Sequence, residues 1–217
     1  MSQYDPEHQV KLVVDEYGPW YRSGTELDAT HIFGQQITMR DALATALTLD
    51  AFNRNADKVS LATCAQLVNN LNALFLAHGD HFIETPNYHV FEMYSGHQGA
   101  LAVRSQFSAP EINYREGGKS ISLWGLNGSA SRQGKSVKVT AVNPDIQAPK
   151  LTQIAVLGAI VESASAVVLA SSDVHAHNTF EYPNMVQSQP LETSISSGLA
   201  TMTIPPGAVM SVDLKIA

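Results

Sequence analysis

The sequence predicts an α/β segment followed by an all-β domain, with the change near residue 98. Up to that point, short apolar runs alternate with segments whose apolar residues recur at helical spacing, which is the pattern of βα units. Beyond it, short runs alternate apolar and polar side chains between Gly, Pro, Asn and Ser, which is typical of an antiparallel β-sandwich. We therefore predict two domains, residues 1–98 and residues 99–217.

The composition excludes several classes of partner. The chain has 217 residues, of which 44% are hydrophobic, and a formal net charge of −7 with no basic block. Nucleic acid and anionic membranes are therefore not expected as partners, whereas a neutral ligand such as a sugar fits. Cys64 is the single cysteine, so no internal disulfide is expected. Homo-oligomerisation is compatible with the sequence but has no specific signal in it.

The N-terminus and the longest apolar stretch bear on where in the cell the protein is located. The first six residues carry an acid and no apolar core, so they do not resemble a signal peptide. The longest apolar stretch, 154–169, is interrupted by Gly158 and Glu162 and is too short and polar to span a membrane. These features favour a cytoplasmic location. The candidate functional residues Glu16 and Trp20, considered below, lie close to Met1, which leads us to expect that the chain is the C-terminal part of a larger enzyme.

The first βα unit begins with the apolar run Val10–Asp15, which predicts a strand buried on both faces. A long polar stretch, 23–36, follows, and loops of this length are usually functional. Thr38 and Asp41 then resemble a capping box, although Asp replaces the usual Glu or Gln. Helical periodicity continues to Phe52, and the helix is expected to end between residues 53 and 56.

The second unit is predicted over the next forty or so residues. The run 59–67 reads as a strand that leads into residues 71–76 and a break at Gly79. Pro86 followed by apolar residues up to Tyr94 predicts a second amphipathic helix, closed by Gly96. Two such units do not make a closed barrel, which needs eight. Either further units are supplied elsewhere, or this part is not stably folded.

The sandwich is predicted from seven runs that alternate apolar and polar residues. Turn-forming residues separate all of them. The runs are 100–103, 120–126, 136–142, 150–157, 166–169, 199–204 and 209–216.

The most informative local feature is the end of the first predicted strand. The strand delivers Glu16 to its C-terminal tip, and a Gly-Pro break then leads to Trp20. A carboxylate with an aromatic ring beside it, at the mouth of a barrel, suits the cleavage of a sugar. Asp15 is adjacent to Glu16 and so points to the opposite face of the strand, which excludes the two as a catalytic pair. The alternative is that both carboxylates only terminate the strand.

Other polar side chains are weaker candidates. Gln66 and Asn69 lie where the second predicted strand would end, and there their amides would either bind sugar hydroxyls or cap the start of a helix. Cys64 is interpreted as a small core residue. His78 with His81, and His175 with the nearby His177, lack a clear third and fourth ligand, so we predict no metal site and no cofactor.

Several segments, in order along the chain, resemble the α-L-arabinofuranosidases of glycoside hydrolase family 51. The segment 13–21 resembles the surroundings of the nucleophile in that family, and the others resemble the last barrel elements and the sandwich. Together they cover nearly the whole chain. The further segments are 39–47, 52–59, 65–69, 85–94, 173–181 and 203–207.

The resemblance implies a retaining hydrolase of terminal α-L-arabinofuranosyl groups in arabinose-containing carbohydrates. The implied architecture is the last two βα units of a (β/α)₈ TIM barrel and a C-terminal jelly-roll sandwich. Glu16 matches the nucleophile, Trp20 matches an aromatic residue that lines the arabinose pocket, and Gln66 matches a pocket amide. Tyr17 stands where the family often carries Trp.

The resemblance also implies a missing partner for Glu16. The family's general acid/base is a glutamate that follows an asparagine near the end of the fourth barrel strand, whereas this chain begins around the seventh. A retaining enzyme needs two carboxyls about 5–5.5 Å apart. Three interpretations therefore remain: a portion of an arabinofuranosidase that is active only in a complete barrel, a non-catalytic carbohydrate-binding module, and an inactive truncated fragment.

Overall fold

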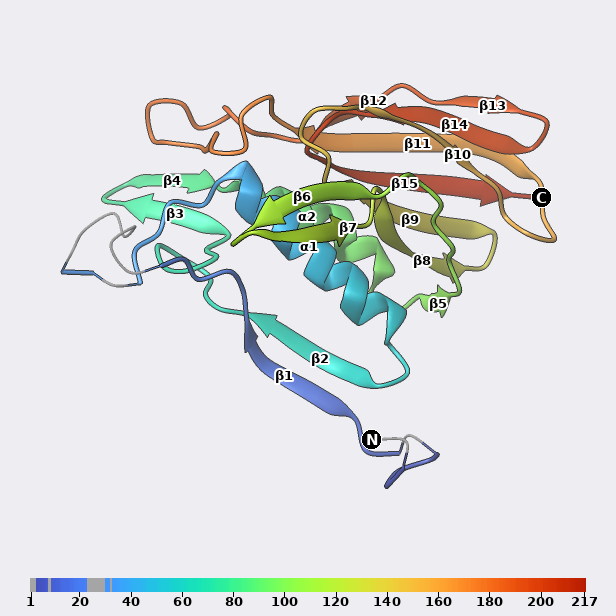
Figure 1. The fold of residues 1–217 in the computed structure, drawn as a ribbon, viewed down its shortest axis with the longest axis horizontal. Helices are drawn as coiled ribbons and strands as arrows, with labels where there is room; N and C mark the ends of the chain where they lie inside the picture. The colour runs from blue at the N-terminus through green and yellow to red at the C-terminus, as the bar shows by residue number, and fades with distance from the viewer. Residues whose placement is uncertain (1–2, 8, 23–29, 32) are drawn as a thin grey trace.

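A computed structural model describes residues 3–7, 9–22, 30–31 and 33–217 of the chain (Figure 1). It contains a small parallel sheet, two helices, and a sandwich of antiparallel sheets. The predicted fold class is therefore confirmed: an α/β segment of partial-barrel type precedes an antiparallel jelly-roll sandwich. Most of the predicted loop 23–36 lies outside the described residues. Among the helices of the described residues, none is long and apolar enough to cross a membrane.

The first βα unit forms, but its strand bounds are shifted and β1 is largely exposed, so the prediction of a strand buried on both faces is wrong for this chain. Strand β1 covers Leu12–Tyr17 and pairs in parallel with β2, Val59–Cys64, while helix α1, Met39–Arg54, connects them. The register of the pair is irregular between Val14 and Tyr17. The predicted run from Val10 begins two residues too early because Val10 has no strand partner, although its side chain is apolar.

Helix α1 begins where the capping residues were predicted. The Asp41 carboxylate accepts hydrogen bonds from the backbone N–H of Thr38 at 2.8 Å and from its hydroxyl at 2.9 Å. The acid in the first turn also faces the positive end of the helix dipole. Met39, Ala42 and Ala46 are fully buried, at helical spacing, and form the face that packs inward.

The connection from β2 to the second helix differs from the prediction. Residues 75–84 form an antiparallel hairpin of β3, Phe75–His78, and β4, His81–Glu84, with Gly79 in its turn at φ 60°. The sequence prediction placed only a break at Gly79, because runs of four residues are too short for strand periodicity to be recognised. Helix α2, Pro86–Tyr94, follows as predicted and continues into the 3-10 turn η1, Ser95–His97.

The sandwich consists of a six-stranded and a three-stranded antiparallel sheet. The larger sheet has the order β12-β11-β15-β9-β8-β5, and the smaller has the order β10-β14-β13. Apolar residues between the sheets, such as Met202, Ile204, Met210 and Leu214, are almost completely buried. The strand bounds are β5 Leu101–Val103, β8 Asn127–Gln133, β9 Ser136–Asn143, β10 Lys150–Ile154, β11 Val161–Ala170, β12 Gln189–Leu191, β13 Ser194–Ser196, β14 Leu199–Ile204 and β15 Ala208–Ile216.

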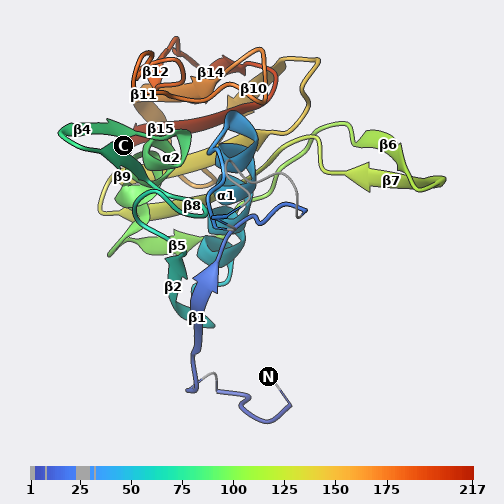
Figure 2. The ribbon, with the colours of Figure 1, turned by 90° about the vertical axis from the view of Figure 1, so that its left-hand side faces the viewer.

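One hairpin stands apart from both sheets. Strands β6, Ile112–Glu116, and β7, Lys119–Leu123, pair only with each other, and Figure 2 shows the hairpin projecting sideways from the body of the molecule. The sequence prediction included the second of these strands but not the first, and it also missed β8, β12 and β13. Polar residues occupy most of β8, which removes the alternation on which the prediction depended.

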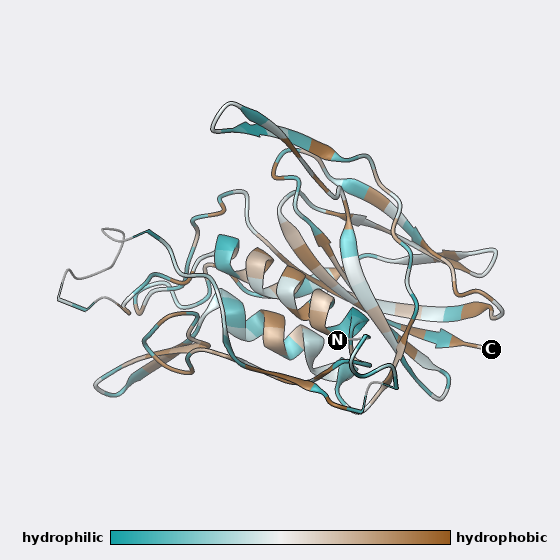
Figure 3. Cartoon of the chain, turned by 60° about the horizontal axis from the view of Figure 1, so that its bottom comes forward, coloured by the Kyte–Doolittle hydropathy of each residue, from teal (hydrophilic) through white to brown (hydrophobic). Residues whose placement is uncertain are grey.

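The two helices lie side by side against the outer face of the six-stranded sheet (Figures 1 and 3). A second core joins Met39 and Val90 of the helices to Val142, Leu169 and Val209 of the sheet. At the end of α1, the guanidinium of Arg54 donates to the carbonyl of Gly128 at 2.6 Å. The predicted domain boundary between residues 98 and 99 falls between η1 and β5 and stays a prediction.

Candidate functional site

Glu16 and Gln66 lie at the same end of the small parallel sheet. Glu16 is the penultimate residue of β1, and Gln66 follows the last residue of β2 by two positions. Because the strands are parallel, their carboxyl ends meet at one edge. In α/β folds, this edge is where catalytic and binding side chains gather.

The packing of Tyr17 determines which way Glu16 points. The ring of Tyr17 meets Phe52 of α1 edge-on, with centroids 5.0 Å apart. Neighbouring side chains of a strand point to opposite faces, so Glu16 lies on the face away from α1. Its carboxylate is exposed and accepts no hydrogen bond from the described residues. Burial raises the pKa of Tyr17 well above its usual value, so the phenol stays protonated.

Asp15 is exposed as well, within the irregular part of the strand register. Its backbone carbonyl accepts a hydrogen bond from the Thr63 hydroxyl of β2. That bond ties the ends of the two strands together and does not involve the Asp15 carboxylate, which makes no hydrogen bond with the residues that the structure describes.

The amide of Gln66 is held by a short hydrogen-bonded chain. Its Oε1 accepts from Nδ2 of Asn70 at 2.6 Å, and Oδ1 of Asn70 lies 2.9 Å from Nε2 of His31. The peptide bond between Ala65 and Gln66 is cis. The Nε2 group of Gln66 makes no hydrogen bond with the described residues, so it is available to a ligand hydroxyl.

Asn69 has a structural role instead. It adopts a left-handed conformation, with φ 62°, and its amide exchanges two hydrogen bonds with the backbone of Ala77, at 2.7 and 2.9 Å. The side chain thereby extends the pairing of β3. Both of its polar atoms bond this backbone, and a hairpin rather than a helix follows, so the predicted helix-capping role of Asn69 is wrong. The predicted binding of sugar hydroxyls by Asn69 stays a prediction.

A glycine and an asparagine connect the two strand ends. Gly18 has φ 150°, a conformation that residues with side chains rarely adopt, and a Cβ at this position would overlap the amide of Asn72. That amide donates to the carbonyl of Ala65 at 2.8 Å. The turn after Glu16 and the residue before Gln66 are therefore held against each other by one side chain.

Trp20 presents an aromatic surface beside this edge. It is 58% exposed, and its ring lies 5.5 Å from the ring of Phe33 at an angle of 42°. Phe33 was not recognised from the sequence, although an aromatic residue inside a polar stretch was a usable signal. Together the two rings offer an apolar surface of the kind that packs on the apolar face of a sugar.

Other candidate nucleophiles and ligands do not add to the site. Burial raises the pKa of the Cys64 thiol to about 11, so the reactive thiolate is scarce near neutral pH. Within the described residues there is no group of three or more His, Cys, Asp or Glu side chains that could hold a metal ion. His175 and His177 lie in the loop between β11 and β12.

Comparison with known proteins shows which proteins the chain is similar to. Residues 15–207 match the family model described as the alpha-L-arabinofuranosidase C-terminal domain. An intracellular exo-alpha-L-arabinofuranosidase of Bacteroides ovatus is 27% identical over 216 residues, which cover 99% of this chain and 41% of that protein. An intracellular exo-alpha-(1->5)-L-arabinofuranosidase of Streptomyces lividans is 24% identical over 208 residues, covering 91% of this chain and 31% of that protein.

Solved structures give the same result. The GH51 arabinofuranosidase from Xanthomonas axonopodis pv. citri superposes with a TM-score of 0.89 at 30% identity, over 99% of this chain and 43% of that one. The alpha-L-arabinofuranosidase of Thermotoga maritima, solved as an arabinose complex, superposes with a TM-score of 0.81 at 25% identity, over 98% of this chain and 45% of that one. The chain thus spans less than half the length of each of these relatives.

Proposed function

Because the chain belongs to the alpha-L-arabinofuranosidase C-terminal domain family and corresponds to the C-terminal portion of a GH51 enzyme, we propose that it provides the nucleophile half of a retaining α-L-arabinofuranosidase site. The observation that carries the proposal is the placement of Glu16. It stands exposed at the carboxyl end of β1, on the face away from α1, with Gln66 at the end of the adjacent parallel strand.

In the proposed mechanism, the Glu16 carboxylate attacks the anomeric carbon of a terminal arabinofuranosyl group. The bond to the leaving oxygen breaks, and that oxygen takes a proton from a second carboxyl, which gives a glycosyl ester on Glu16. The second carboxylate then removes a proton from water, which attacks the same carbon and frees arabinose and Glu16. Trp20 would pack on the sugar, and the free Nε2 group of Gln66 would donate to one of its hydroxyls.

The second carboxyl is proposed to come from outside this chain. The described part contains two parallel strands, and the apolar side chains of Leu12, Val13 and Leu61 on them are 45%, 49% and 53% exposed. Parallel sheets are normally covered on both faces and continued at both edges. Further barrel strands would cover these residues, and one of them would bring the acid/base carboxyl about 5–5.5 Å from Glu16.

The substrate class follows from the relatives. The relatives from Bacteroides ovatus and Streptomyces lividans are named as intracellular and exo-acting arabinofuranosidases, and the second name specifies the α-(1→5) linkage. For this chain we propose action on terminal arabinofuranosyl groups, without specifying the linkage. We also propose an intracellular location. The family match favours this function over a non-catalytic binding module.

The test is covalent trapping in an assembled site. The polypeptide is combined with the rest of the barrel, as a fusion in the order of the Bacteroides ovatus relative, and treated with an activated arabinofuranoside whose ester intermediate hydrolyses slowly. A mass increase of one pentosyl unit on the peptide that contains Glu16 supports the proposal. Labelling of another carboxylate, or equal labelling of the Glu16→Gln variant, contradicts it.

A further inference from the structure

A single turn connects the two candidate substrate contacts, Trp20 and Gln66. It is closed by a hydrogen bond from the backbone N–H of Gly34 to the carbonyl of His31 at 2.9 Å, as in a β-turn. Gly34 is buried, and a Cβ there would approach that carbonyl to 3.2 Å. We call it the His31 turn; it lies in the segment between β1 and α1. The closing bond holds His31 and the nearby Phe33 in a fixed relation to each other.

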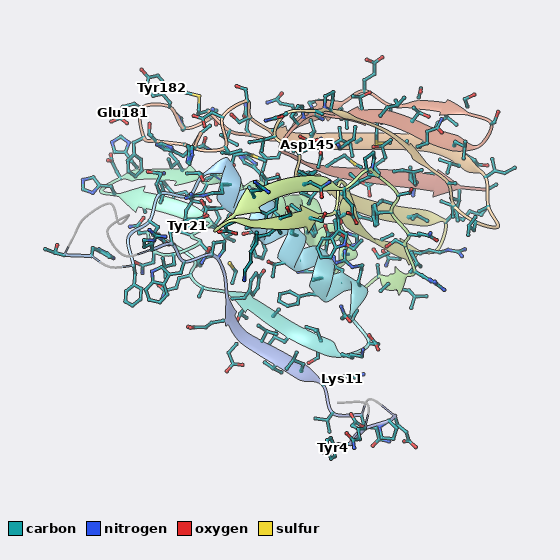
Figure 4. The ribbon with its side chains drawn as sticks, viewed as in Figure 1. Tyr4, Lys11, Tyr21, Asp145, Glu181 and Tyr182 are labelled. Atoms are coloured by element: carbon teal, nitrogen blue, oxygen red, sulfur yellow. The ribbon has the colours of Figure 1, made fainter. Side chains whose placement is uncertain are left out.

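On one side, the His31 turn contacts the aromatic candidate. The ring of Phe33 lies 5.5 Å from the ring of Trp20, at an angle of 42°. Trp20 is also anchored through the next residue, since Tyr21, labelled in Figure 4, donates its hydroxyl to Oδ1 of Asp41 in α1 at 2.9 Å. Asp41 is buried, so the anchor belongs to the packed part of the helix. Phe33 and this anchor together set the position of the indole.

On the other side, the His31 turn reaches Gln66 through one side chain. Nε2 of His31 lies 2.9 Å from Oδ1 of Asn70, and Nδ2 of Asn70 donates to Oε1 of Gln66 at 2.6 Å. An amide oxygen only accepts hydrogen bonds, so the imidazole nitrogen that faces Asn70 carries a proton. Because Oε1 of Gln66 is already bonded, the group that Gln66 presents to a ligand is its donor, Nε2.

The backbone beneath this chain of bonds is fixed without His31. The N–H of Asn70 donates to the carbonyl of Val68 at 2.9 Å, and its carbonyl accepts from the N–H of Ala73 at 3.1 Å. Gln66 itself is exposed, so packing does not select one orientation of its side chain. A glutamine side chain that is free to rotate loses much rotamer entropy when it is ordered. The bonds from His31 through Asn70 supply that order before a ligand arrives.

We propose that His31 and Asn70 are positioning residues, which hold the Gln66 amide so that its Nε2 group donates to a hydroxyl oxygen of the substrate. The inference rests on the proposed function, in which Gln66 contacts the arabinofuranosyl group. It adds that this hydroxyl is recognised as a hydrogen-bond acceptor. Phe33 belongs to the same turn and contacts Trp20, so one turn sets the two substrate contacts relative to each other.

The first test measures the mobility of the Gln66 amide in the polypeptide of residues 1–217 and does not depend on turnover. Side-chain ¹⁵N relaxation reports the order of the Nε2 group on the ps–ns timescale. We expect His31→Ala to lower this order, and His31→Gln, whose amide can replace the imidazole donor, to retain it. His81→Ala removes another exposed imidazole, on β4, and is the matched control. An amide that is equally mobile in the unaltered chain and in His31→Ala contradicts the inference.

The second test is a double-mutant cycle in the fusion with the remaining barrel units. His31→Ala and Asn70→Ala should each lower kcat/KM about three- to tenfold, and His31→Gln should restore most of the loss. If His31 acts through Gln66, His31→Ala should have no further effect in the Gln66→Ala variant, because residues that act through each other are not additive. His81→Ala should leave kcat/KM unchanged.

The outcomes separate this inference from the proposed function. Non-additive losses with rescue by His31→Gln support the positioning role. Turnover that depends on Glu16, combined with losses in His31→Ala and Gln66→Ala that simply add, contradicts the positioning role and leaves the proposed function standing. Turnover that does not depend on Glu16 contradicts the proposed function and, with it, the contact of Gln66 with the substrate.

Discussion

The side-chain amide of Asn72 occupies the space that a Cβ on Gly18 would need. Through that amide, which donates to the carbonyl of Ala65 at 2.8 Å, the turn after Glu16 is locked to the residue before Gln66. The position of Glu16 relative to Gln66 therefore depends on Gly18 and Asn72. The Asn72 amide bonds the backbone next to Gln66 and not the side chain of either candidate residue.

Gly18→Ala is expected to displace Asn72 and separate the two strand ends. The backbone at φ 150° adds strain of order 1–3 kcal/mol for a residue with a Cβ. In the assembled enzyme we expect kcat/KM to fall by at least about tenfold, with a lower Tm. Gly117→Ala, whose added Cβ meets no atom although φ is also positive, at 54°, is the control for strain alone. Equal losses in both variants would show that the contact with Asn72 is irrelevant.

Asn178 is expected to hold the loop between β11 and β12 to the α/β part. It is 1% exposed, its Nδ2 donates to the carbonyls of Glu84 and Val186 at 2.9 Å each, and its Oδ1 accepts from the N–H of Val186 at 2.7 Å. Asn178→Ala takes this partner from the two buried backbone groups of Val186 and from the part-buried carbonyl of Glu84, and should lower the free energy of unfolding by about 2–4 kcal/mol. Chemical denaturation measures this. The exposed Asn113→Ala should change it by less than about 0.5 kcal/mol; similar values for both would refute the role.

The buried Asp50 of α1 and the half-buried His97 of η1, which both bond the sandwich, are expected to give opposite pH dependences. Burial raises the pKa of Asp50 to about 6, against hydrogen bonds from Ser129 and Thr140 and the nearby Arg54. The folded chain then binds more protons than the unfolded one between about pH 4 and 6, so this contribution to stability falls as pH rises. Tyr94 of α2 also faces Asp50.

His97 acts in the opposite direction. Burial, with Lys138 nearby, lowers its pKa to about 4 despite Asp213, so the unfolded chain binds more protons between about pH 4 and 6.5. Relative to wild type, Asp50→Asn should make the free energy of unfolding rise more steeply with pH in this range, and His97→Gln should make it fall. Urea denaturation at pH 4, 5, 6 and 7 measures both slopes. Parallel curves for all three proteins would contradict the assignment.

Residues 1–217 alone should hydrolyse 4-nitrophenyl α-L-arabinofuranoside no faster than buffer does. Glu16 can attack, but no second carboxyl on its side of the strand is proposed within this chain to protonate the leaving group or activate water. The release of 4-nitrophenol is followed against buffer and against Glu16→Gln. Turnover that disappears in Glu16→Gln would overturn this expectation.

The sequence predicted best those elements whose local signals agree with their packing. Helix α1 has a recognisable start at Thr38 and Asp41 and a buried face at helical spacing, so its bounds were close. Strand β8 is mostly polar, and two of its side chains bond α1: the buried Ser129 bonds Asp50, and Asn127 bonds Arg54, so its placement depends on contacts distant in sequence. No local pattern could reveal it.

At the candidate site, too, local sequence signals could be recognised and contacts between distant residues could not. Glu16 and Trp20 could be predicted because Glu16 stands at the end of an apolar run and Trp20 follows a Gly-Pro break within ten residues. The link between Gly18 and Asn72, and the chain from Gln66 through Asn70 to His31, join residues 35 or more positions apart or depend on backbone conformation. Such relationships appear only when the strands are paired.

The most direct test of the account is chemical rescue of Glu16→Ala in a chimera in which this chain replaces the C-terminal portion of the Bacteroides ovatus relative. The unaltered chimera should cleave an activated α-L-arabinofuranoside, and Glu16→Ala should lose at least about a thousandfold in kcat. Added azide, entering the space that the carboxylate vacates, should restore turnover and give the β-configured arabinofuranosyl azide. Undiminished turnover of Glu16→Ala, or formation of the α-configured azide, would contradict the assignment of Glu16 as the nucleophile.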